Sequence, residues 1–111
     1  MIPNKEVQEL AQALKRSAEY SEMMRLRRKV MEHPRFGRQM LMFEREHSRL
    51  YSLGPQQPDV AQRLKKLYSD FRGVLAEEEV KKFIDSSRAY QKLISETITY
   101  LNKLLDSGRI Y

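Results

Sequence analysis

The chain has 111 residues, the size of one domain, and a formal net charge of +6 from 21 Lys and Arg against 15 Asp and Glu. It contains no cysteine, which excludes a disulfide framework, a thiol nucleophile and a cysteine-held zinc or iron–sulfur site. Only four Gly and four Pro are present and helix formers dominate, so the composition predicts a single all-α domain over residues 1–111.

The N-terminal half, residues 1–51, is expected to begin with two short helices. Apolar residues recur at helical spacing over residues 4–16, and Asn4 is the expected N-cap. A weaker apolar stripe predicts a second helix over residues 17–32. The sequence leaves open whether the chain breaks at Ser17, breaks at Ser21 or continues as one helix.

A third helix is expected over residues 34–51, because a proline such as Pro34 favours the first helical position. Its apolar residues alternate steps of four and three and would line one face: Phe36, Met40, Phe43, His47 and Leu50. A second, mostly basic stripe lies beside that face: Arg38, Met42, Arg45 and Arg49.

The clearest loop joins the two halves at residues 52–58, where Gly, Pro and Gln gather. Asp59 is expected to cap the next helix, with Gln62 completing a capping box. The apolar spacing loses its phase near residues 76–79 and then resumes. The sequence therefore predicts about five helices in all. The last two would form a hairpin over 59–108 in which a long helix, stopped by Gly108, pairs with the preceding one.

The last predicted helix, over residues 78–107, would be roughly 45 Å long at 1.5 Å per residue. An apolar seam of that length is hard for 111 residues to cover alone, so we expect a homo-oligomer, a dimer or larger. The residues expected to form the packing and association seam are Phe36, Met40, Phe43, Val80, Phe83, Tyr90, Ile94 and Leu101.

No combination of residues predicts catalysis. Glu44 and His47 form a Glu-x-x-His pair, but a di-iron site needs a second such pair, and Val30 stands where the glutamate of His33 would be. His47 lies on the apolar stripe, which favours a packing role. We therefore expect no enzyme, no metal and no cofactor.

The positive charge is concentrated between Arg25 and Arg49, which carries +5 of the +6. The residues that could contact an acidic partner are Arg28, Arg35, Arg38, Arg45 and Arg49. One interpretation is contact with RNA phosphates or an acidic protein face, and the other is a solvated helix surface. Aromatic side chains are not interleaved with the arginines, so nucleic acid is the less favoured partner.

The order of these segments resembles a known family. The residues that carry the resemblance are Ser17, Tyr20, Val30, His33, Pro34, Met40 and Phe43, followed by Val80, Phe83, Tyr90, Leu93, Ile94 and Ile98. This pattern, from about Val7 to Leu105, is similar to the YlbF/YmcA family of small bacterial helical proteins.

The resemblance implies an all-α fold that oligomerises through long helices. It also implies a role like that of relatives that regulate competence, biofilm formation and sporulation in a complex that modulates RNA processing by an endoribonuclease. Two features depart from the family: His33 replaces the usual acidic residue before the proline, and the cysteines that hold an iron–sulfur cluster in some members are absent.

Together these observations predict a non-catalytic helical adaptor or regulator that self-associates and binds a protein partner. The alternative is a basic RNA-binding accessory protein that uses the Arg25–Arg49 region. No segment has the roughly 18 continuous apolar residues of a membrane span. Residues 1–6 lack the pattern of a secretion signal, so we expect a cytoplasmic location.

Overall fold

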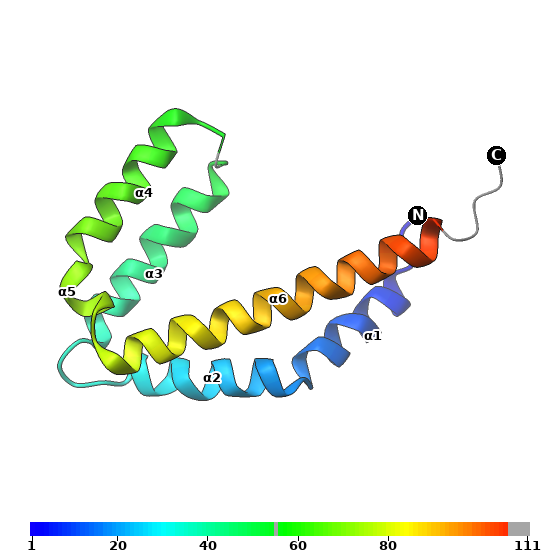
Figure 1. Ribbon diagram of the computed structural model, residues 1–111, viewed down its shortest axis with the longest axis horizontal. Helices are drawn as coiled ribbons and strands as arrows, with labels where there is room; N and C mark the ends of the chain where they lie inside the picture. The colour runs from blue at the N-terminus through cyan, green and yellow to red at the C-terminus, as the bar shows by residue number, and fades with distance from the viewer. Residues whose placement is uncertain (55, 107–111) are drawn as a thin grey trace. The chain divides into compact units, whose positions relative to one another are not determined.

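The computed structural model describes residues 1–54 and 56–106, and this part of the chain is helical without strands (Figure 1). Its elements are α1 (Asn4–Lys15), α2 (Ala18–Met31), α3 (Gly37–Ser52), α4 (Pro58–Asp70), α5 (Arg72–Leu75) and α6 (Glu78–Asp106). The all-α prediction and the long C-terminal helix are confirmed. The expected stop at Gly108 lies outside the described residues. Within these ranges no helix combines the length and apolarity needed to cross a bilayer.

The chain divides into two compact units, and the division runs through α2 and α6. Unit 2 is the continuous segment Leu26–Phe83. Unit 1 combines Met1–Arg25 with the segment that starts at Ile84. Each unit therefore contains a part of α2 and a part of α6.

Unit 2 is built around the pair α3 and α4, which run side by side and are joined by the loop after Ser52 (Figure 1). Its core follows the spacing that the sequence predicted for helix faces. The buried hydrophobic residues are Val30, Phe36, Met40, Phe43, Leu50, Val60, Leu67, Val74, Val80 and Phe83. Burying a side chain of this kind contributes roughly 1.5–3 kcal/mol, so this set is the main apolar contribution to the stability of unit 2.

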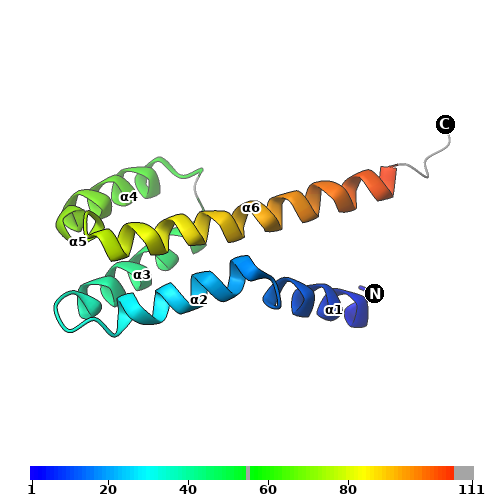
Figure 2. The same ribbon diagram turned by 60° about the horizontal axis from the view of Figure 1, so that its bottom comes forward.

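The partner of α6 differs from the one expected. The long helix packs against α2, whereas α4 packs against α3 (Figures 1 and 2). In unit 1 the rings of Tyr20 and Tyr90 meet edge to face with centroids 5.2 Å apart. In unit 2, Val30 of α2 and Val80 of α6 are both completely buried. The short helix α5 separates α4 from α6, and the apolar spacing loses its phase just after it, near residues 76–79.

The chain breaks between α1 and α2 at Ser17, one of the alternatives left open by the sequence. The Ser17 hydroxyl accepts a hydrogen bond from the Tyr20 amide at 3.1 Å and donates one to the Leu14 carbonyl at 2.6 Å. This side chain satisfies an amide at the start of α2 and a carbonyl at the end of α1. Ser21 lies inside α2.

Two expected N-caps are wrong. The cap of α1 is Pro3, and Asn4 is already the first helical residue. The cap of α4 is Gln57, two residues before Asp59, because Pro58 occupies the first turn of the helix. The Asp59 carboxylate instead lies 3.2 Å from the guanidinium of Arg63 one turn later.

Helix α3 begins at Gly37, three residues after the expected start at Pro34. The segment before it forms a turn that His33 organises: its Nδ1 lies 3.1 Å from the Arg35 amide, which donates to it. The imidazole stacks on Phe36 with ring centroids 3.9 Å apart. Phe36 is the N-cap residue of α3, and its side chain is buried in the core of unit 2.

Candidate interaction surfaces

The predicted association seam divides into two groups in the structure. Five of its residues pack inside unit 2: Phe36, Met40, Phe43, Val80 and Phe83. The other three belong to unit 1, where Tyr90 and Ile94 are half-buried and Leu101 is 44% exposed. Only this second group leaves apolar surface open to contact.

An exposed apolar stripe continues along unit 1. On α6, Ile98 is 52%, Leu101 44% and Leu105 63% exposed, and these residues follow Ile94 at steps of four, three and four. That spacing places them on one side of the helix. The helix α1 has no buried residue, and its Val7 and Leu10 are 51% and 41% exposed. We name the set Val7, Leu10, Ile94, Ile98, Leu101 and Leu105 the apolar stripe.

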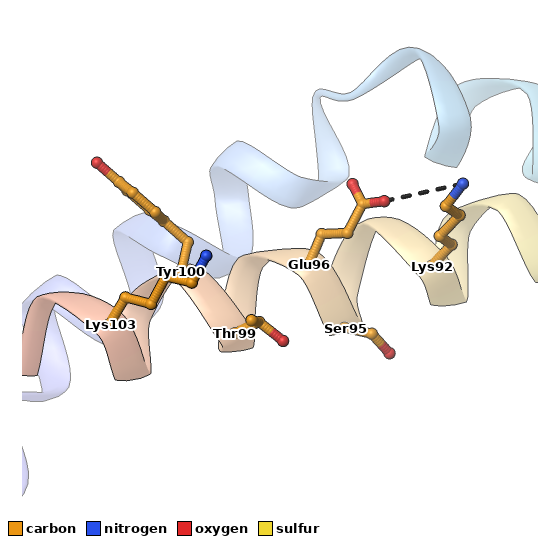
Figure 3. A pocket seen from close by; sticks show the side chains of 6 residues that line it. All are labelled: Lys92, Ser95, Glu96, Thr99, Tyr100 and Lys103. Carbon is orange, nitrogen blue, oxygen red and sulfur yellow. Dashed lines mark ion pairs between the residues drawn. The ribbon is translucent and has the colours of Figure 1, made fainter. Parts of the chain in front are cut away.

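The opposite side of α6 is polar. A shallow hollow there is lined by Lys92, Ser95, Glu96, Thr99, Tyr100 and Lys103, all from this one helix (Figure 3). Lys92 and Glu96 point toward each other with Nζ and Oε1 3.9 Å apart, whereas the hydroxyls of Ser95 and Thr99 point to another side. The side chains diverge around a single helix and do not converge on one point, so the hollow resembles a solvated helix face.

The predicted basic residues differ in their partners. Both guanidinium nitrogens of Arg35 reach the Glu77 carboxylate, at 3.0 and 3.1 Å. Arg49 is held by Glu46 one turn away, and its guanidinium lowers the pKa of that carboxyl. The remaining three are exposed and form no ion pair within residues 1–54 and 56–106: Arg28, Arg38 and Arg45.

Glu44 and His47 contact different partners. The Glu44 carboxylate accepts two hydrogen bonds from Arg27 of α2, at 2.5 and 3.2 Å, and so connects α2 to α3. His47 Nε2 lies 2.9 Å from the Tyr68 hydroxyl of α4. No group of three or more His, Asp or Glu side chains in the described part of the chain could hold a metal ion.

His47 lies in an aromatic cluster between α3 and α4. Its ring centroid is 5.4 Å from that of Phe43, 4.6 Å from that of Tyr51 and 5.8 Å from that of Tyr68. Desolvation by these neighbours lowers the pKa of His47 below its ordinary value of 6.5. The geometry agrees with the packing role expected from the position of His47 on the apolar face of α3.

Sequence reasoning missed the role of Gly37. A Cβ placed on Gly37 would be 3.0 Å from the Met31 carbonyl carbon and would overlap the carbonyl oxygen. The end of α2 therefore approaches the start of α3 so closely that only glycine fits there. The position of Gly37 just after the Pro34 turn was the only signal, and a lone glycine is weak evidence without the fold.

With this geometry in place, comparison with known proteins adds one finding. A family model described as control of competence regulator ComK, YlbF/YmcA, matches residues 4–106. The chain belongs to the YlbF/YmcA family. No curated protein and no solved structure matches the chain.

Membership of the YlbF/YmcA family confirms the resemblance drawn from the sequence and supports a regulatory role. The match extends over every helix described above, so both the core of unit 2 and the apolar stripe of unit 1 lie inside it. His33, the departure noted from the usual YlbF/YmcA pattern, has a local structural role in the turn before α3.

Proposed function

We propose that the protein is a non-catalytic, cytoplasmic regulator that associates with a second copy of itself through unit 1 and binds a protein partner as that oligomer. One observation carries the proposal. All ten buried hydrophobic residues in the described chain lie within Leu26–Phe83, the range of unit 2. Unit 1 has no buried hydrophobic side chain among its described residues, although it contains two helical segments with apolar sides.

Burial of the apolar stripe would favour association of unit 1 with another apolar surface. Several exposed apolar side chains on the helices of a small protein are typical of an interaction site. Each large side chain that becomes fully buried contributes roughly 1.5–3 kcal/mol, and a symmetric contact counts each of them twice. Leu104, at 54% exposure, extends the same surface at one edge.

The residues beside the stripe favour more than one covering helix. The positions that flank Ile98 and Leu101 on α6 are Ser95, Thr97, Asn102 and Leu104, none of which is charged. A two-stranded coiled coil usually has charged residues at these places, whereas a helix inside a bundle does not. The charged residues Lys92, Glu96 and Lys103 lie on the far side.

A second copy supplies the covering helices most simply. Within unit 1, α1 runs beside the C-terminal half of α6 in both views (Figures 1 and 2). Two such pairs related by a two-fold axis would form a four-helix bundle with their apolar sides inward. We propose this dimer as the form in which the protein acts.

The regulatory part of the proposal comes from the family. The printed description of the family is control of the competence regulator ComK. We propose that this member likewise acts on a regulatory pathway by protein contact. The absence of catalysis is part of the proposal, supported by Glu44 and His47 each being held by a structural partner.

Light scattering on three purified proteins tests the proposed dimer. The parent and Thr99→Asp, which places the new charge on the polar side of α6, should have at least twice the chain mass of 13.2 kDa. Leu101→Asp should have the mass of one chain, because it puts a charge into the stripe. Circular dichroism should show the same helix content in all three. Equal masses for the parent and Leu101→Asp would reject the proposal.

A further inference from the structure

The outward side of α3 combines positive charge with exposed apolar surface. Arg38 and Arg45 are exposed and form no ion pair with any residue in the described ranges. Between them along the helix, Met42 is 61% and Leu41 37% exposed. Residues 38, 41, 42 and 45 share one helix side, opposite the buried Met40 and Phe43. We name these four residues the Arg–Met stripe.

We propose that the Arg–Met stripe docks an acidic amphipathic helix of a partner protein. The inference rests on the proposed function, in which the oligomer binds a protein, and it specifies the kind of partner and the face of unit 2 that receives it. Helix-to-helix docking of this type uses an apolar centre with charges at its ends.

The spacing of the stripe defines what the partner helix must present. Arg38 and Arg45 are seven residues apart, which is two helical turns or about 10.5 Å along the axis. Two carboxylates seven residues apart on the partner would match them, and each guanidinium can donate two parallel hydrogen bonds to a carboxylate. Apolar side chains between those carboxylates would cover Met42 and Leu41, and the flexible thioether can adapt to their shape.

The composition of the surface favours protein over nucleic acid. A phosphate backbone would satisfy the two arginines but would leave Met42, the most exposed hydrophobic side chain of α3, in water. The next arginine on this side, Arg49, is already held by Glu46, so the cations do not continue as a track along the helix. Carboxylates with an apolar centre satisfy both parts of the stripe.

The contrast with neighbouring arginines supports this assignment. Arg27 and Arg35 are each bound by two hydrogen bonds to a carboxylate of the same unit, and these pairs join elements of the fold. Arg38 and Arg45 have no such structural role. Charged residues exposed beside an apolar side chain are typical of a contact surface.

Fluorescence anisotropy with a designed peptide tests the proposal on the unmodified protein. The probe is a labelled helical peptide of about 20 residues with Glu at positions seven apart and Leu between them on the same side. A scrambled peptide of equal composition and a labelled single-stranded RNA of about 20 nucleotides serve as comparators. The variants are Arg38→Gln with Arg45→Gln, Met42→Ser, and the control Arg63→Gln, whose guanidinium pairs with Asp59 on α4.

The designed peptide should bind the parent more tightly than the scrambled peptide does. Its Kd should rise about tenfold or more in the double arginine variant and several-fold in Met42→Ser. Arg63→Gln should leave the Kd within about twofold. The proposal is overturned if the designed peptide does not bind, if Arg63→Gln weakens binding as much as the double variant, or if RNA binds and Met42→Ser has no effect. Light scattering on the same samples reports the oligomer separately, so failure of docking is distinguishable from failure of self-association.

Discussion

The imidazole of His47 on α3 and the hydroxyl of Tyr68 on α4 are joined by a hydrogen bond of 2.9 Å inside an aromatic cluster. The contact lies between the two helices that form the body of unit 2. It places a titratable group where a positive charge is poorly solvated, and this makes the stability of unit 2 depend on pH.

Burial lowers the pKa of His47 below its ordinary value of 6.5, so the folded state binds this proton less readily than the unfolded state does. The free energy of unfolding should therefore fall as the pH is lowered from about 7.5 through 6.5 to the depressed pKa of the folded state. The urea midpoint measured at pH 7.5 and 5.5 checks this. His47→Gln should lose most of the difference between the two midpoints, and an equal difference in both proteins would contradict the assignment.

Two glycines in unit 2 should respond to alanine in opposite directions. Gly37→Ala forces a Cβ onto the Met31 carbonyl and should lower the free energy of unfolding by about 1–3 kcal/mol. A Cβ at Gly73 in α5 meets nothing within 4 Å. Gly73→Ala should therefore stabilise the protein by up to about 1 kcal/mol through helix propensity. Urea unfolding measures both, and a Gly37→Ala variant at least as stable as the parent would show that the close approach of α2 and α3 is absent.

Two methionines on opposite sides of α3 should differ in how much they contribute to the free energy of unfolding. Met40 is 2% exposed and Met42 is 61% exposed. Met40→Ala should cost about 2–5 kcal/mol of unfolding free energy, since it opens a cavity in the core. Met42→Ala should change it by no more than about 0.5 kcal/mol. Similar losses in both variants would contradict the orientation of α3 on which the Arg–Met stripe depends.

Periodicity predicted which residues share a helix face, and unit 2 bears this out in detail. Val60, Leu67 and Val74 recur at steps of seven and are all buried, although α4 and α5 divide the stretch. The spacing of apolar residues follows directly from the geometry of an α-helix, so it survives a local break. Sequence spacing could therefore indicate which residues share a helix face, although it did not separate buried residues such as Phe83 from exposed ones such as Leu101.

Helix ends and helix partners were less predictable because they depend on contacts distant in the sequence. Asp59 has a good side chain for capping, but Pro58 fits the first turn and moves the cap to Gln57. The apolar face of a helix also does not indicate which other helix will cover it. The long C-terminal helix was expected to pair with the preceding helix, yet α6 packs against α2.

The candidate surfaces were predictable only in part for the same reason. Sequence spacing placed Phe83 and Leu101 on one seam, whereas the fold buries the first within unit 2 and leaves the second exposed in unit 1. Similarly, the sequence does not distinguish Arg35 from Arg38 as a candidate contact residue. The fold does, because it places Glu77, which is distant in the sequence, beside Arg35. Exposure and ion pairing, on which the proposed surfaces rest, follow from tertiary contacts.

Sedimentation equilibrium of the unmodified protein over a wide range of dilution measures self-association through unit 1. We expect a species of at least twice 13.2 kDa that dissociates only at high dilution, because a second copy would cover the apolar stripe of unit 1. A species of 13.2 kDa at every concentration, with Ile98 and Leu101 accessible to solvent, would contradict it.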